Sequence, residues 1–95
     1  MTHVIKILEP YADAIEEGRK NFEVRYNDRG YNAGDEVTFL VVEDDKTCVA
    51  YHPLERKRFE ITYIHSGLGM EDGYVVFGLK EKLRKGENYG SSNDD

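Results

Sequence analysis

Residues 21–26 read Asn-Phe-Glu-Val-Arg-Tyr and alternate between apolar and polar side chains. Successive side chains of a β-strand point to opposite faces, so this alternation predicts a strand with two chemically different faces. The apolar and the polar set are Phe22, Val24 and Tyr26 against Asn21, Glu23 and Arg25. We therefore expect a strand over Asn21–Tyr26, and the rest of the fold is predicted outward from it.

A strand and a short helix are expected before this segment. Residues 4–8 alternate and are rich in aliphatic side chains, which predicts a first strand. Pro10 suits the first turn of a helix, and an apolar stripe with i, i+3, i+4 spacing follows: Tyr11, Ala14 and Ile15. Gly18 ends the helix. Two turns are marginal alone, so the stripe is expected to pack against a sheet.

Four further strands are expected after a turn-rich loop over residues 27–35. In residues 36–43, apolar side chains occur at both odd and even positions and therefore on both faces of a strand. This pattern is typical of a strand covered on both faces and predicts a central position in the sheet. Strands over residues 47–51 and 58–65 are expected to form a hairpin, with Phe59, Ile61 and Tyr63 on one face of the second. A glycine-rich stretch, 66–73, leads to a closing strand over residues 74–79.

Six short strands and one early helix favour an α+β domain, and curling the sheet into a small β-barrel would hide its edges. Gly78 lies inside the last strand, where glycine marks either a bend or bulge or a close packing contact. We expect one domain over residues 1–82 and a polar tail over residues 83–95. Residues 87–95 contain no aliphatic side chain and are expected to be disordered.

The composition limits the cellular setting and the partners. Cys48 is the only cysteine among the 95 residues, and no apolar run approaches the ~18 residues that span a bilayer. With no signal-peptide pattern at the amino terminus, we expect a cytoplasmic protein, monomeric and not bound to membranes. A net charge of −6 opposes broad binding to duplex DNA, although Arg19, Lys20, Arg25 and Arg29 cluster locally.

Residues 18–25, Gly-Arg-Lys-Asn-Phe-Glu-Val-Arg, resemble the Gly-x-Lys-x-x-Glu-x-Arg signature of the ASCH superfamily, whose members have a PUA-like β-barrel. The chain also resembles a short ASCH-like family common in phages and prophages, over about residues 3–80. The further matching positions are His3, Lys6, Asn27-Asp28-Arg29, Gly34-Asp35 and Gly73-Tyr74-Val75-Val76. The resemblance implies a small mixed barrel of the PUA-like, ASCH type.

The resemblance also implies two activities. ASCH domains are generally proposed to bind RNA or nucleotides, and some small bacterial members are amidohydrolases that deacetylate N4-acetylcytidine. Lys20 would match the catalytic lysine of those enzymes. Glu23 stands where they have a threonine, and the chain has no counterpart to their later segment with the catalytic glutamate.

Lys20, Glu23 and Arg25 are the central candidates for a ligand site at the mouth of the barrel. The two cations would hold a phosphate or a base edge, and Glu23 would accept a hydrogen bond from an exocyclic amine. In an enzyme, Lys20 would act as a base with Glu23 orienting water. The alternative is a surface salt bridge without a ligand. Tyr26 and Tyr31 could stack a base or belong to the core.

The remaining candidates surround this cluster. Asn27, Asp28 and Arg29 could line the same pocket or simply form turns beside Gly30. His3 and Lys6 belong to the resemblance, and a hydrogen-bonded, partly buried role is the alternative for His3. The three histidines, His3, His52 and His65, are too widely spaced to predict a metal site, and we expect no cofactor.

The sequence thus favours a non-enzymatic module that binds RNA or a nucleotide-like ligand. Two alternatives stay open: an amidohydrolase acting on an acylated nucleobase, and a phage-derived protein-interaction domain.

Overall fold

The computed structural model describes residues 1–83. Its elements, in chain order, are β1 (Thr2–Leu8), α1 (Glu9–Glu16), β2 (Phe22–Tyr26), β3 (Glu36–Val42), the 3₁₀-helix η1 (Pro53–Arg56), β4 (Arg58–His65) and β5 (Tyr74–Lys82). The predicted tail, residues 83–95, lies outside the described residues except for Leu83. Within residues 1–83, no helix is long and apolar enough to cross a bilayer.

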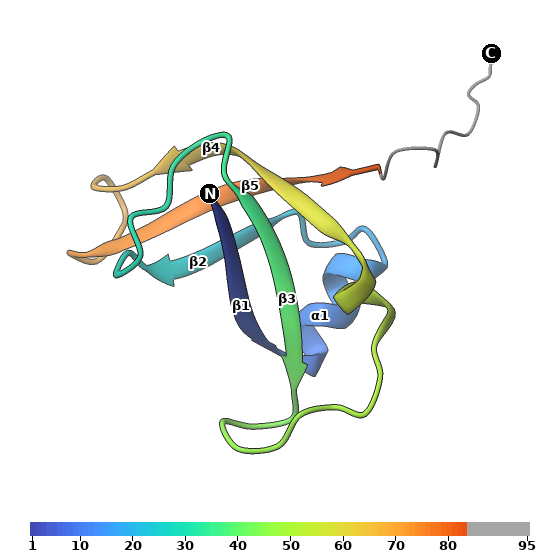
Figure 1. The fold of residues 1–95 in the computed structure, drawn as a ribbon. Helices are drawn as coiled ribbons and strands as arrows, with labels where there is room; N and C mark the ends of the chain where they lie inside the picture. Colours follow the sequence, from blue (N-terminus) through green and yellow to red (C-terminus); the bar gives the residue numbers. More distant parts are fainter. Residues whose placement is uncertain (84–95) are drawn as a thin grey trace, which may run out of the picture.

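The strands form one curved sheet in the order β1-β3-β4-β5-β2, which curls into a half-barrel (Figure 1). β1 and β3 run parallel, and each of the other neighbouring pairs is antiparallel. The expected α+β class and barrel-like sheet are confirmed. Within residues 1–83 the barrel does not close by backbone pairing, because β1 and β2 are the two edge strands of the sheet.

The predicted strand over residues 47–51 is wrong, and so is its hairpin with residues 58–65. Only one bridge, Val42 with Cys48, is formed there, and β4 pairs with β3 and β5 instead. The carboxylate of Asp44 accepts hydrogen bonds from the backbone of Lys46 and Thr47, both at 2.8 Å. This turn carries the chain away from β3 after a single bridge, so the sheet has five strands among the described residues.

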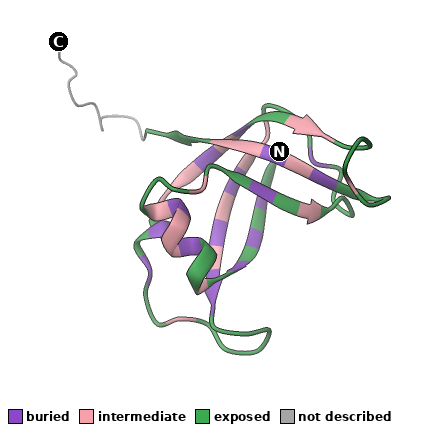
Figure 2. Ribbon diagram, turned by 180° about the vertical axis from the view of Figure 1, so that it is seen from behind, coloured by how far each residue is buried: buried purple, intermediate pink, exposed green. Residues whose placement is uncertain are grey.

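The core lies on the inner face of the half-barrel, where alternate residues of each strand are buried (Figure 2). Its members from the strands are Ile5, Ile7, Val37, Phe39, Val41, Phe59, Ile61, Val75 and Phe77. α1 contributes Ala12 and Ile15, whereas Tyr11 is 54% exposed. Ile15 of the predicted stripe is thus buried and Ala14 half-buried, but Ala12 takes the place expected for Tyr11, since β1 leads directly into α1 and fixes which side meets the sheet.

A bulge in β4 changes which residues of that strand face the core. Ile61 pairs with Leu79, but the next pair is Ile64 with Phe77, so β4 has one extra residue there. Tyr63, expected on the face of Phe59 and Ile61, is 71% exposed as a result. A Cβ on Gly78 would lie 2.6 Å from Thr62 Oγ1 in the bulge, which explains the glycine in β5.

The segment between β3 and β4 closes one end of the half-barrel beside α1. Leu54 of η1 is fully buried, and the carboxylate of Glu55 accepts a hydrogen bond from Val41 N at 2.8 Å. His52 Nε2 donates to the carboxylate of Asp13 on α1 at 2.7 Å, while its Nδ1 accepts from Leu54 N. These contacts hold α1 in the place where its amino-terminal part borders the site.

Candidate functional site

β2 has its polar face inside and its apolar face outside. Glu23 is only 4% exposed, whereas Phe22, Val24 and Tyr26 are 42%, 49% and 57% exposed. The alternation predicted for this strand is confirmed, but an exposed salt bridge is ruled out for Glu23. Because β2 is an edge strand beside the open side of the half-barrel, its inward polar groups reach partners there.

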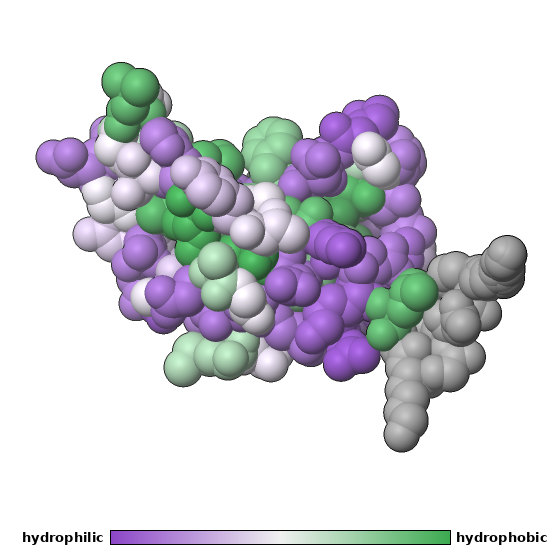
Figure 3. Space-filling view, turned by 90° about the horizontal axis from the view of Figure 1, so that it is seen from above, coloured by the Kyte–Doolittle hydropathy of each residue, from purple (hydrophilic) through white to green (hydrophobic). Residues whose placement is uncertain are grey.

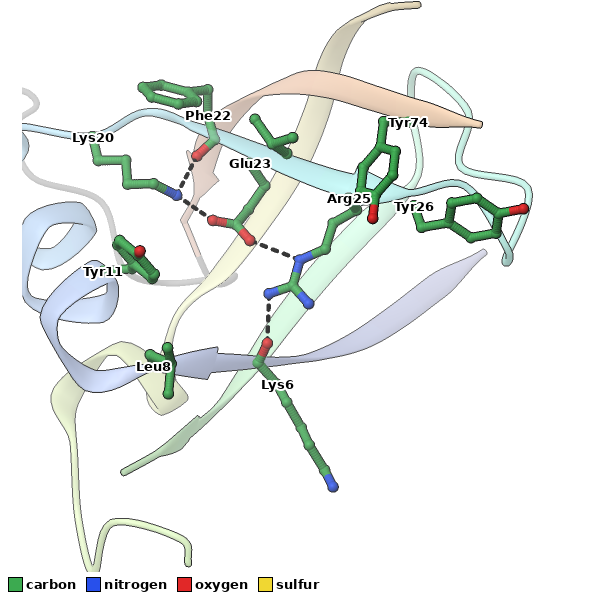
Figure 4. A pocket seen from close by; sticks show the side chains of 10 residues that line it. Lys6, Leu8, Tyr11, Lys20, Phe22, Glu23, Arg25, Tyr26 and Tyr74 are labelled. Carbon is green, nitrogen blue, oxygen red and sulfur yellow. Dashed lines mark hydrogen bonds and ion pairs between the residues drawn. The ribbon is translucent and has the colours of Figure 1, made fainter. Parts of the chain in front are cut away.

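Glu23 is held between two cations (Figure 4). Lys20 Nζ donates to one carboxylate oxygen and also to the carbonyl of Phe22 at 2.7 Å. Arg25 Nε donates to the other oxygen at 2.9 Å. Lys20 precedes β2, so strand parity does not apply to it, and its side chain reaches the same side as Glu23 and Arg25. The three predicted residues therefore form one contiguous network.

Arginine side chains bridge the gap between β1 and β2, which we call the seam. Arg25 Nη2 donates to the carbonyl of Lys6 at 2.5 Å, and Arg29 Nη1 donates to the carbonyl of Val4. Both carbonyls belong to the edge strand β1, which carries backbone groups without a strand partner on that side. Lys6 contributes its backbone here, and its side chain extends away from the other labelled residues (Figure 4).

A pocket of about 570 Å³ opens at the seam between β1, α1 and β2. This seam pocket is lined by Lys6, Leu8, Tyr11, Lys20, Phe22, Glu23, Val24, Arg25, Tyr26 and Tyr74. Its volume falls within the range of small-molecule sites. Lys20 Nζ lies 5.0 Å from the ring centre of Phe22 and 5.7 Å from that of Tyr11, so the ammonium is flanked by aromatic rings.

Two predicted residues lie in the core instead of the seam pocket. Tyr31 is 5% exposed and its ring packs against those of His3 and Phe77, with ring centres 4.7 and 5.0 Å away. Burial raises the pKa of the Tyr31 hydroxyl. His3 Nε2 donates to the carboxylate of Asp35 at 2.8 Å. The contacts of both residues are those of packed structural side chains.

Asn27, Asp28 and Arg29 are neighbours in sequence, but their side chains have different surroundings. Asn27 Oδ1 accepts a hydrogen bond from Tyr31 N at 2.9 Å and so orders the turn. Asp28 is exposed, and its backbone N–H donates to Tyr26 O. Arg29 spans the seam as described. Asn27 also borders a second hollow of about 390 Å³, formed with residues 66–67 and 70–75 and with Tyr26, which we call the loop hollow.

Sequence reasoning missed the aromatic and aliphatic lining of the seam pocket, chiefly Leu8, Tyr11, Phe22 and Tyr74. Tyr11 was placed on the buried stripe of the helix, and alternation alone does not tell which face of a strand is buried. The available signal was that Phe22 and Tyr26 lie on the same face of the strand, opposite the polar face of Glu23 and Arg25. Among residues 1–83, no three histidine, cysteine or carboxylate side chains gather in a way that would hold a metal ion.

The fold and the site define a small α+β protein whose curved five-stranded sheet is open along one seam and carries a polar pocket there. The chain belongs to the family described as Domain of unknown function (DUF3850), whose family model matches residues 2–79. No curated protein matches the chain.

Proposed function

We propose that the seam pocket binds a nucleotide, either free or as an unpaired nucleotide of RNA. The observation that carries this proposal is a buried carboxylate, Glu23, fixed between Lys20 and Arg25 beside exposed aromatic rings. The resemblance of residues 18–25 to the ASCH signature, and of the curled sheet to a PUA-like barrel, supports the same class of ligand.

Each chemical group of a nucleotide has a counterpart in the pocket. A carboxylate has about four lone-pair positions, so Glu23 retains acceptor capacity for an exocyclic amine beyond its bonds to Lys20 and Arg25. The two cations would face phosphate oxygens, for which arginine offers paired N–H donors. Tyr11, Phe22 and Tyr26 present exposed faces on which a base would stack.

Binding fits the contacts of Lys20 better than hydrolysis of an acylated nucleobase. A general base must be neutral before it accepts a proton. Lys20 Nζ instead donates to the Phe22 carbonyl and the Glu23 carboxylate, which are partners of an ammonium group. We therefore assign Lys20 the role of a cation that contacts the ligand, and incubation with N4-acetylcytidine is expected to release no acetate.

The proposal is tested by titrating the ¹⁵N-labelled protein with CMP, AMP, GMP and UMP, followed residue by residue. Binding is expected to shift the amide signals of residues 6–8, 11, 20–26 and 74. Glu23→Gln keeps the shape of the side chain and removes its charge, and is expected to weaken binding about tenfold, as for a charge-assisted hydrogen bond.

Glu17→Gln is the matched control, because Glu17 pairs with Arg19 on the exposed surface and does not line the seam pocket. It should bind like the parent. If no nucleotide shifts any signal of the pocket, the proposal is wrong, and a protein-interaction role for this surface would be favoured.

A further inference from the structure

We infer that the ligand is a single-stranded oligonucleotide of two or more nucleotides, with one nucleotide in the seam pocket and a neighbouring one in the loop hollow. This inference rests on the proposed function and assigns a second subsite to it. The two depressions are contiguous, since Tyr26 and Tyr74 line both of them. Both rings therefore lie at the boundary between the seam pocket and the loop hollow.

Tyr26 and Tyr74 form a fixed aromatic partition between the two subsites. They are cross-strand partners, their ring centres lie 5.4 Å apart, and the ring planes meet at 75°. Both rings remain accessible, at 57% and 37% exposure. Exposed aromatic rings of this kind are typical of proteins that bind unpaired bases, so each ring is assigned to stack one base.

The position of the Tyr26 ring depends on Gly73. A Cβ on Gly73 would lie 2.5 Å from Tyr26 Cε1, and its backbone has a positive φ of +86°. The carbonyl of Gly73 accepts a hydrogen bond from Asn27 N at 2.8 Å, which holds the turn against the end of β2. Tyr26 is therefore seated over a bare backbone and kept at the boundary of the subsites.

The two subsites carry opposite charges, and this difference indicates which chemical group of the ligand each subsite binds. The seam pocket has Lys20 and Arg25 for phosphate, whereas the loop hollow has the carboxylates of Glu71 and Asp72. Neither carboxylate has a side-chain partner among the described residues. Carboxylates accept from the exocyclic amine of cytosine, so the second base is one with an amino edge.

Figure 3 shows the surface from above, with apolar residues exposed between hydrophilic ones. Because Tyr26 and Tyr74 are themselves exposed, the bases of a flexible strand can contact their rings while its backbone stays hydrated. A duplex is excluded as the ligand, because paired and stacked bases do not present their faces to the tyrosines.

The test compares CMP, r(C)₄, r(U)₄ and d(C)₄ by calorimetry and by amide shifts. One added stacked base is expected to make r(C)₄ bind about tenfold more tightly than CMP. Signals of residues 66–67 and 70–73, which line only the loop hollow, should shift with the oligonucleotides and not with CMP. r(C)₄ should also bind more tightly than r(U)₄, and the d(C)₄ arm tells whether the 2′-hydroxyl contributes.

Glu71→Gln combined with Asp72→Asn is expected to remove the preference for r(C)₄ over r(U)₄ while leaving CMP affinity within about twofold. Asp45→Asn is the control for a carboxylate lost elsewhere, since Asp45 is exposed in the β3–η1 segment.

Failure of this inference differs from failure of the proposed function. If CMP binds in the seam pocket but r(C)₄ binds no more tightly and the signals of residues 66–67 and 70–73 do not shift, the second subsite does not exist. If neither CMP nor any oligonucleotide binds, both proposals are wrong. Equal affinity for r(C)₄ and r(U)₄ would overturn the assignment of an amino-edged base.

Discussion

Glu23 shows how an ionised side chain is tolerated inside a domain of this size. Burying a carboxylate is costly unless it is paired and hydrogen-bonded. Here each oxygen has its own cationic partner, and those partners keep contact with water, with side chains 16% and 29% exposed for Lys20 and Arg25. The network is therefore both a structural element and a charged surface that a ligand can reach.

Removing this carboxylate is expected to destabilise the fold. Glu23→Ala leaves Lys20 and Arg25 without their shared partner in a partly desolvated place, so the free energy of unfolding should fall by about 2–3 kcal/mol. Glu17→Ala removes an exposed partner of Arg19 and should cost less than about 1 kcal/mol. Urea unfolding of both variants measures the difference, and equal losses would show that Glu23 is effectively solvent-screened.

Asp35 gives the molecule a defined response to acid. The hydrogen bond from His3 lowers the pKa of Asp35 below its usual 3.8, helped by the N–H of Asn32 and the nearby amino terminus. A depressed carboxyl pKa stabilises the fold above the unfolded value, and this stability is lost as the pH falls through the folded pKa.

Asp35→Asn is expected to be less stable than the parent at pH 6, and the gap should narrow as the pH falls below 3.8. Denaturant unfolding at pH 6, 3 and 2 measures this gap. A gap that stays constant over the whole range would mean that the charge of Asp35 does not contribute.

At the scale of elements, β2 shows which features of a strand can be predicted from the sequence and which cannot. β2 was predicted from the alternation of apolar and polar residues over 21–26, and β3 from apolar residues on both faces over 36–43. Such patterns can be read from sequence because the periodicity of side chains is a local property. The inverted burial of β2 could not be predicted, since it depends on the open seam. The bulge in β4 and the turn at Asp44 likewise depend on neighbouring segments. The bulge exposes Tyr63, which was expected on the face of Phe59, and the turn prevents the strand predicted over residues 47–51.

The candidate site was predictable to a similar extent. Lys20, Glu23 and Arg25 were found because they lie close in sequence and resemble the ASCH signature. Tyr11 and Tyr74 come from elements far apart in the chain and meet only after the sheet has formed. His3 was chosen from the resemblance and Tyr31 as a ring that could stack a base, yet the contacts of both belong to the core, because one sequence does not separate structural from ligand-contacting residues.

The junction of β2 and β5 depends on a glycine whose role can be separated from its backbone conformation. Gly73→Ala introduces both positive-φ strain and a clash with the Tyr26 ring, whereas Gly69→Ala introduces only the strain, because nothing lies within 4 Å of its Cβ. Gly73→Ala should therefore destabilise by about 1–2 kcal/mol more than Gly69→Ala. Thermal or urea unfolding compares them, and equal losses would mean that Tyr26 moves aside freely.

At the scale of the whole molecule, two guanidinium groups take the place of the missing strand ladder between β1 and β2. Arg25 and Arg29 bind the Lys6 and Val4 carbonyls and thereby cover an exposed sheet edge. Side chains instead of backbone hydrogen bonds join β1 to β2. The seam therefore holds the two edge strands together and still leaves the pocket open to solvent.

Arg29→Ala is expected to loosen β1 without unfolding the domain. Loss of one charge-assisted hydrogen bond at the seam should raise amide hydrogen exchange in β1 by roughly tenfold. Arg19→Ala, which breaks only an exposed pair with Glu17, is the control. Unchanged exchange in β1 relative to that control would show that the Arg29 contact does not restrain the edge.

The strand order also determines when the site is assembled during synthesis. Among the strands that the structure describes, β2 pairs only with β5, and its first residue, Phe22, lies opposite Gly78. A ribosome must therefore make residues 27–73 before Tyr26 meets its partner Tyr74, and such distant pairings form late because loop closure precedes them. β1, α1 and β3 can associate earlier. The nascent chain thus exposes its aromatic strand for most of translation, and the pocket is completed last.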